Sequence, residues 1–339
     1  MTNTANTALV LGASGGIGGE VARQLCEAGW QVRALQRNLG APSLQRDGMT
    51  WFDGDAMQRA DVLRAAEGCA VIVHAVNPPG YRRWAQLVLP MLDNSLAAAR
   101  ANGATIVLPG TVYNYGPDVF PLIHDDAPQR PLTRKGAIRV ELERRLQAAA
   151  EAGEARVIIV RAGDFFGPRV RNSWFSQAMV KPGRSVSAVN LPASAGVGHQ
   201  FAYVPDVARC MLRLLAMRAQ LPAFARYNMA GHWDADGRTL GRAIQRVVGR
   251  HGAPKPRLQA FAWWQVRLAA PFIATLREIL EMRYLWQREV RLDNSGLRAV
   301  LGEEPHTPLD EAIEASLIGI GCLPAPAHDK RDKTAAASA

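Results

Sequence analysis

One short glycine-rich segment constrains the fold of this chain more than any other. The apolar run Ala8-Leu9-Val10-Leu11 has the character of a buried strand and leads directly into Gly12-Ala13-Ser14-Gly15-Gly16-Ile17-Gly18. A helical pattern then extends from Ile17 to Ala28 and stops at Gly29. Glycines at positions 12, 15 and 18, between a strand and a helix, are typical of a turn pressed against a dinucleotide pyrophosphate. We therefore expect a dinucleotide site here, the alternative being a tight turn that binds no ligand.

Each glycine of this turn has its own physical role in such a site. Gly12 permits the tight turn, Gly15 lets the backbone approach the phosphates, and Gly18 lets the helix pack close to the strand. The start of the helix then offers free N–H groups and the positive end of its dipole to the anion.

Strand-like and helix-like segments alternate through the first half of the chain. Between residues 69 and 76 the sequence is continuously apolar, as a strand covered on both faces requires. The alternation predicts an α/β protein with a doubly wound parallel sheet of the Rossmann type. The predicted strands are 8–11, 30–37, 50–52, 69–76, 105–108 and 155–161, and the predicted helices are 17–28, 57–66, 82–102 and 134–152.

The alternation of strand-like and helix-like segments ends after Gly163, where prolines and glycines mark loops between helical patterns. We expect a nucleotide-binding core over residues 1–165 and a smaller, mainly helical substrate lobe over 166–327 that returns some elements to the core sheet. Residues 328–339 have the composition of a disordered tail. The predicted helices of the lobe are 207–219, 239–249 and 258–287.

Composition excludes several classes of function. The formal charge of +10 comes from basic residues spread along the chain, without a nucleic-acid-binding motif, so we expect no nucleic-acid partner. No signal peptide or membrane span is predicted, and the four cysteines are scattered, which favours a reduced, cytoplasmic setting and no metal site. The expected partner is a small-molecule substrate, with a homodimer left open. The Trp- and Arg-rich stretch 261–286 is expected to cover a pocket or to pack as a helix against a partner. The alternative is an amphipathic helix at a membrane surface.

Further segments recur in a fixed order after the glycine-rich turn. Together they resemble the extended short-chain dehydrogenases/reductases, specifically the epimerase/dehydratase group, over about residues 7–322. Their order carries the resemblance, because no single motif is decisive. The segments are Asp53-Gly54-Asp55-Ala56, Thr111-Val112-Tyr113-Asn114-Tyr115-Gly116, Arg161-Ala162-Gly163-Asp164-Phe165-Phe166-Gly167-Pro168, Phe201-Ala202-Tyr203-Val204-Pro205-Asp206-Val207-Ala208 and Tyr227-Asn228-Met229.

The residue that follows the second predicted strand bears on the choice of cofactor. In dinucleotide folds an acidic residue about 20 positions past the glycines binds the adenosine ribose. This chain has Arg37 there, and arginine pairs well with a 2′-phosphate, to which Ser14 could add a hydrogen bond. NADP is therefore favoured over NAD, the alternative being a solvated Arg37 and a site that accepts either. The candidate cofactor-binding residues are Gly12, Ser14, Gly15, Gly16, Ile17, Gly18, Arg37, Asp55, Ala56 and Ala75.

The resemblance also implies a catalytic Ser/Thr and a Tyr-x-x-x-Lys helix, and here the chain departs from the pattern. Thr111 matches the Ser/Thr position, but the helix beginning near residue 131 has no tyrosine. If Lys135 is the motif lysine, Pro131 stands at the tyrosine position. We prefer the frame in which Arg139 replaces the lysine and Lys135 the tyrosine, because it keeps both on one helical face.

Three interpretations of the missing tyrosine follow. Lys135 is an unusual acid/base, a tyrosine of the 111–116 loop (Tyr113 or Tyr115) supplies the phenol, or the chain binds NADP without turnover. The candidate catalytic residues are Thr111, Tyr113, Lys135 and Arg139. The predicted function is an NADP-dependent oxidoreductase or an epimerase/dehydratase-like enzyme acting on a small carbonyl or hydroxyl compound. The alternative is a non-catalytic NADP-binding regulator that senses redox state.

Overall fold

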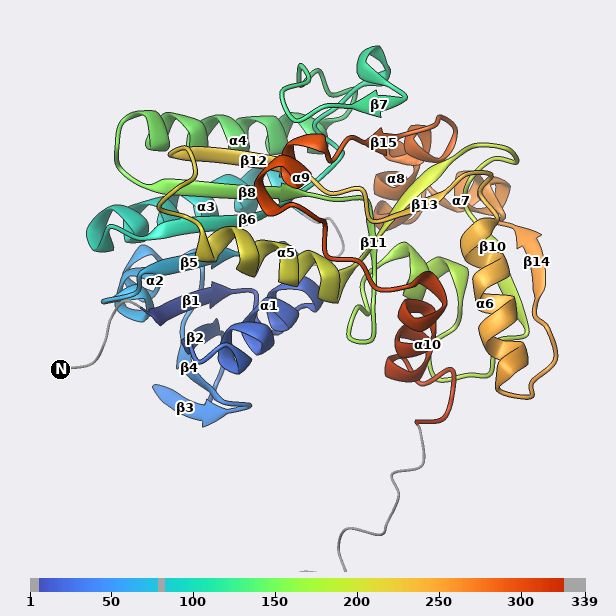
Figure 1. The fold of residues 1–339 in the computed structure, drawn as a ribbon, viewed down its shortest axis with the longest axis horizontal. Coiled ribbons are helices and arrows are strands. Elements are labelled where there is room, and N and C mark those ends of the chain that lie inside the picture. Colours follow the sequence, from blue (N-terminus) through green and yellow to red (C-terminus); the bar gives the residue numbers. More distant parts are fainter. Residues whose placement is uncertain (1–5, 79–82, 326–339) are drawn as a thin grey trace, which may run out of the picture.

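A computed structural model describes residues 6–78 and 83–325, and its centre is an eight-stranded sheet (Figure 1). The strand order is β12-β8-β6-β5-β1-β2-β4-β3. All neighbouring strands are parallel except β3 and β4, which are antiparallel. The strands are β1 (Thr7–Leu11), β2 (Gln31–Gln36), β3 (Ser43–Arg46), β4 (Met49–Asp53), β5 (Val71–His74), β6 (Thr105–Gly110), β8 (Arg156–Arg161) and β12 (Phe224–Asn228). This order confirms the predicted doubly wound sheet, with the reversal of strand order between β1 and β5.

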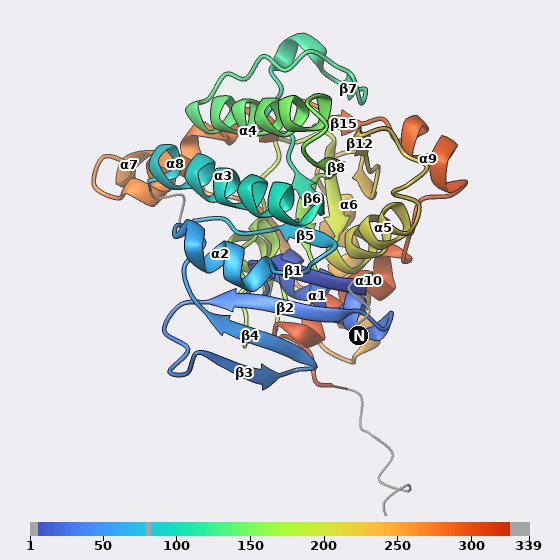
Figure 2. The same cartoon turned by 90° about the vertical axis from the view of Figure 1, so that its left-hand side faces the viewer.

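Helices cover both faces of the sheet (Figure 2). The first strand shows why the sequence is apolar at consecutive positions: Ala8 and Val10 pack into the core on one face, and Leu9 and Leu11 into the core on the other. On the first face lie α1 (Gly16–Glu27) and α5 (Val204–Ala216). On the second lie α2 (Arg59–Ala66), α3 (Trp84–Asn102) and α4 (Arg134–Glu151).

The C-terminal region forms a mixed lobe beyond the carboxyl ends of the strands, at the right of Figure 1. A separate apolar core, which includes Phe175, Trp286 and Ile313, holds this lobe together. Its helices are α6 (Thr239–Arg250), α7 (Trp263–Ala269), α8 (Ala274–Glu281) and α10 (Leu309–Gly319). Helix α9 (Ser295–Leu301) instead returns to the central sheet, where it packs beside β12 in the core of the first face. Its small sheets are β13-β11-β9 (His232–Asp234, His199–Tyr203, Asp164–Phe166) and β10-β14 (Ala188–Leu191, Arg257–Ala260), and β15 (Arg291–Leu292) pairs with β7 (Leu122–Ile123).

The sequence prediction missed one strand of the central sheet and was wrong about one helix. Strand β3 was not predicted, because its edge position leaves it polar and without an apolar run. The helix predicted over 258–287 is broken into β14, α7, α8 and a short helical turn over Arg283–Trp286. Residues of β14 pair with β10, and Pro271, which has no N–H to donate, follows the end of α7.

The predicted tail over 328–339 lies outside the described residues. Within the part of the chain that the structure describes, no helix is both long and apolar enough to cross a membrane.

Candidate cofactor and substrate site

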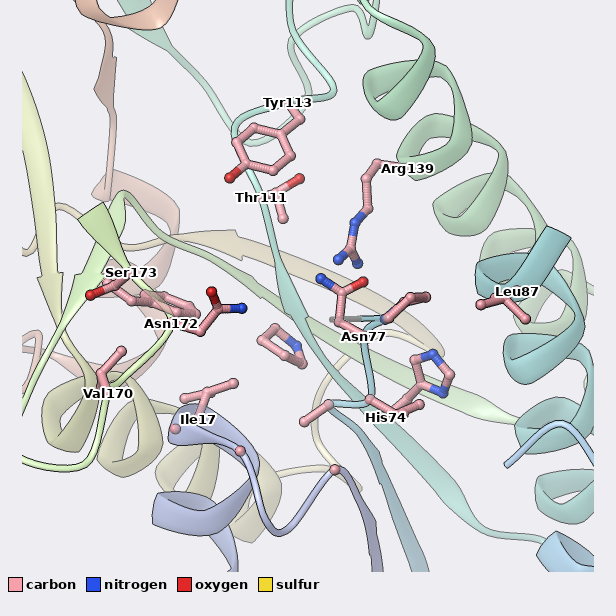
Figure 3. Close-up of a pocket in the computed structure, with 18 of the residues that line it drawn as sticks. Ile17, His74, Asn77, Leu87, Thr111, Tyr113, Arg139, Val170, Asn172 and Ser173 are labelled. Carbon is pink, nitrogen blue, oxygen red and sulfur yellow. The ribbon is translucent and has the colours of Figure 1, made fainter. Parts of the chain in front are cut away.

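A cavity of about 1060 Å³ lies at the carboxyl ends of the core strands, between the sheet and the lobe (Figure 3). The loops that follow β1, β2, β4, β5 and β6 line one side of it, and segments of the lobe line the other. Parallel strands of this topology place their ligands at such a crevice. Nine of the ten predicted cofactor residues line it, all except Gly18.

The glycine-rich turn has the geometry of a phosphate cradle. Gly12 has a φ of 89°, and a Cβ on it would lie 2.5 Å from the carbonyl oxygen of Ala75. A Cβ on Gly18 would lie 2.3 Å from the carbonyl oxygen of Gly12, so this glycine permits the close packing of α1 on the turn. Gly15 precedes α1 in an extended conformation and has no side chain with which to cap the helix. The N–H groups at the start of α1 are therefore suited to an anionic ligand.

The tip of β2 presents a cation to the same cavity. Arg37 follows the last residue of β2, lines the cavity and is 69% exposed at its side chain. Its guanidinium lies 3.9 Å from the carboxylate of Asp55, which lines the cavity together with Ala56. An exposed guanidinium at this point can turn toward a phosphate group without leaving a buried partner unpaired.

Thr111, Tyr113 and Arg139 face one space in the cavity (Figure 3). Thr111 follows β6 and donates a hydrogen bond from Oγ1 to Oδ1 of Asn114 at 3.0 Å. The guanidinium carbon of Arg139, on α4, lies 5.1 Å from the centre of the Trp84 ring. A hydroxyl, a phenol and a guanidinium together can orient a carbonyl oxygen and stabilise negative charge on it.

Lys135 lies one turn before Arg139 on α4, but it is not among the residues that line the cavity. Its ammonium forms ion pairs with the carboxylates of Glu278 and Glu281, the latter at 2.8 Å, and donates to the carbonyl oxygen of Glu278 at 2.9 Å. The side chain is 2% exposed. The structure thus gives Lys135 contacts that join α4 to α8, whereas its acid/base role stays a prediction.

The two tyrosines of the 111–116 loop have different surroundings. Tyr113 lines the cavity, whereas Tyr115 is fully buried outside the cavity lining. Burial raises the pKa of the Tyr115 phenol to about 12, which makes it a poor proton donor at neutral pH. Of these two phenols, Tyr113 is the one placed to act on a ligand.

His74, at the end of β5, lines the cavity with a neutral imidazole. Burial, with a smaller contribution from the charge of Arg139, lowers the pKa of His74 to about 3. Its Nδ1 lies 2.8 Å from Oγ of Ser95, within hydrogen-bond distance. The ring therefore contributes shape and polarity to the cavity without a charge.

The structure adds lobe residues that the sequence did not single out as site residues. Asn172, Trp174 and Glu278 line the cavity. Asp164 also lines it, and its carboxylate lies 2.7 Å from Nε2 of His199, which is buried behind it. The aromatic composition of 261–286 was the available signal in the sequence. Besides Glu278, this segment supplies six apolar lining residues: Phe261, Leu276, Ile279, Met282, Leu285 and Trp286.

A protein-family model and several solved structures are similar to this chain. The model of the NAD dependent epimerase/dehydratase family matches residues 8–230. No curated protein matches the chain. Among solved structures, UDP-glucuronic acid 4-epimerase from Bacillus cereus in complex with NAD is similar at a TM-score of 0.71 and 15% identity, over 93% of this chain and 98% of that one.

Two further solved structures have the same fold. UDP-glucose 4-epimerase from Brucella ovis in complex with NAD has a TM-score of 0.70 and 15% identity, over 94% of this chain and 99% of that one. UDP-glucose 4-epimerase from Bifidobacterium longum, in complex with NAD+ and UDP, has a TM-score of 0.67 and 14% identity, over 92% and 97% of the two chains. At these identities the likeness is one of fold.

Proposed function

The chain belongs to the NAD-dependent epimerase/dehydratase family, and from this premise we propose that it is an NADP-dependent enzyme that oxidises or reduces a small carbonyl or hydroxyl compound. One observation carries the proposal. A single cavity is lined by the glycine cradle, by Arg37 and by the polar group of Thr111, Tyr113 and Arg139. Cofactor-binding and reactive groups thus share one space.

The cofactor half of the proposal rests on the cradle and on Arg37. The similar structures that contain NAD support a nicotinamide dinucleotide in this fold. Arg37 then favours the 2′-phosphate of NADP, because a guanidinium pairs with phosphate through two parallel hydrogen bonds. Gly12, Gly15 and the start of α1 would hold the pyrophosphate.

The chemical half assigns roles to three side chains. When bound, the nicotinamide supplies or accepts a hydride. The Thr111 hydroxyl orients the substrate oxygen, the Tyr113 phenol exchanges a proton with it, and the Arg139 guanidinium stabilises the negative charge that develops there. Lys135 acts at a distance, by fixing α8 as the cover of the cavity.

A turnover assay tests this assignment. NADPH oxidation with a panel of aldehydes and ketones, and NADP+ reduction with the matching alcohols, are followed by nicotinamide absorbance. We expect Tyr113→Phe to lower kcat by about 10²–10⁴, the usual effect of removing a general acid. Tyr115→Phe is the matched control from the same loop and leaves kcat near wild type. Loss of kcat in Lys135→Met with little change in Tyr113→Phe would assign the proton to the lysine instead.

The absence of the Tyr-x-x-x-Lys motif supports a second candidate function, that of a protein that binds NADPH without turnover. A redox-sensing regulator would bind NADPH at the same cradle and show no turnover with any compound of the panel. Tight NADPH binding without turnover would favour that function over the enzyme.

A further inference from the structure

The lobe side of the cavity is apolar and aromatic where it faces away from the glycine cradle. Trp174 packs edge-on against Trp286, with ring centres 5.0 Å apart, and against Phe261, with ring centres 5.8 Å apart. All three rings line the cavity, and α8 adds Ile279. Such a surface gains free energy by removing apolar ligand area from water.

The charged groups on this side of the cavity are acidic. Among the described residues from 162 onward that line the cavity, two carry carboxylates, Asp164 and Glu278, and none is a lysine, arginine or histidine. Each carboxylate already has a partner that is not among the lining residues of the cavity, His199 for Asp164 and Lys135 for Glu278. A phosphate group here would meet carboxylates and rings, and its buried charge would stay unpaired.

Neutral hydrogen-bonding groups are nevertheless available. Asn172 points into the space that Thr111, Tyr113 and Arg139 face from the other side (Figure 3). An amide and a hydroxyl suit a carbonyl or alcohol oxygen on an otherwise apolar ligand.

We propose that the substrate is an uncharged, predominantly apolar carbonyl or alcohol, and that a nucleoside diphosphate sugar is not accepted. This inference rests on the proposed function for the site but concerns a different part of the cavity. The similar structures named above are UDP-sugar epimerases, so the two substrate classes make opposite demands on the lobe. A diphosphate needs cations, and the lobe side of this cavity offers aromatic rings.

Binding measurements separate the two classes without relying on turnover. The full chain is titrated by calorimetry with 2-acetylnaphthalene, decanal and UDP-glucose, both with saturating NADPH and without it. We expect at least one of the uncharged compounds to bind about 100-fold or more tightly than UDP-glucose. The inference would be overturned if UDP-glucose bound as tightly as the tighter-binding uncharged compound. It would also be overturned if neither uncharged compound bound. Failure of NADPH itself to bind is a separate result and would overturn the proposed function.

A matched pair of variants on α8 locates the binding surface. Ile279 lines the cavity, and Leu280, the next residue, does not, although both are partly buried. Ile279→Asn should weaken binding of the uncharged ligand by about tenfold and leave NADPH affinity unchanged. Leu280→Asn should leave both affinities within about twofold of wild type. Equal effects of the two variants on the uncharged ligand would place its binding elsewhere.

Discussion

Replacement of Lys135 by methionine separates a structural from a catalytic role for this buried cation. The ammonium is 2% exposed, and the carboxylates of Glu278 and Glu281 that it pairs with are 29% and 21% exposed. Removing one partner from a buried ion pair costs about 3–5 kcal/mol. Because these carboxylates are partly hydrated already, we expect a smaller loss than this, about 2–3 kcal/mol of unfolding free energy.

Urea unfolding of the purified chain measures this loss. Arg134→Met is the matched control, because Arg134 is the residue before Lys135 and is exposed. This substitution should change the free energy of unfolding by less than about 0.5 kcal/mol. A double-mutant cycle of Lys135→Met with Glu281→Gln should show a coupling of about 1–3 kcal/mol, since the two groups share one ion pair.

The kinetic consequence differs from that of losing a general acid. If Lys135 only holds α8 over the cavity, Lys135→Met raises KM and leaves kcat within a few-fold. A variant as stable as wild type, additive with Glu281→Gln and deficient only in kcat would refute the structural role.

Two further perturbations test the cradle and the buried histidine. Gly15→Val keeps an extended backbone that valine adopts readily, and its Cβ would lie 3.2 Å from the carbonyl oxygen of Gly12, so the fold should persist with a small local shift. Its methyl groups fill the phosphate space, and the loss of about two phosphate hydrogen bonds should weaken NADPH binding by more than about 100-fold, whereas Gly249→Val on α6 leaves it intact. The pKa of His74 is about 3 in the folded chain, below its ordinary value of about 6.5. Between these two values the unfolded chain binds a proton at His74 that the folded chain does not, so stability falls as the pH drops below about 6.5. Between pH 7.5 and pH 5 this group should account for about 2 kcal/mol of lost stability. The free energy of unfolding of His74→Gln, measured by urea titration, should therefore depend less on pH than that of wild type. The same pH dependence in both proteins would show that the imidazole is not buried in its neutral form.

The parts of the structure that follow local rules could be predicted from sequence. The conformation of Gly12, with its positive φ, and the alternating contacts of β1 depend on a few neighbouring residues, and the glycine spacing and apolar runs encode them. The predicted adenosine-side cation, Arg37, also lines the cavity because it follows directly from the end of β2.

Features that depend on distant residues could not be predicted in the same way. Lys135 and Arg139 share a helical face, as expected, yet only Arg139 lines the cavity, because Glu278 and Glu281 of α8 hold the lysine. These partners lie more than a hundred residues away in the sequence, and no local pattern pairs them. The pairing of β14 with β10 is another long-range contact, and it replaced a helix that the composition of the segment favoured.

The central claim is that the glycine cradle and Arg37 bind NADP, and a titration with NADPH and NADH tests it most directly. Loss of a bidentate phosphate contact should cost about 1.5–3 kcal/mol, or about 10- to 150-fold in Kd. The account predicts that wild type binds NADPH by this factor more tightly than NADH, that Arg37→Ala abolishes the preference, and that Arg59→Ala, an exposed arginine outside the cavity lining, preserves it. Equal affinities of wild type for the two cofactors, or a preference for NADPH that survives Arg37→Ala, would contradict it.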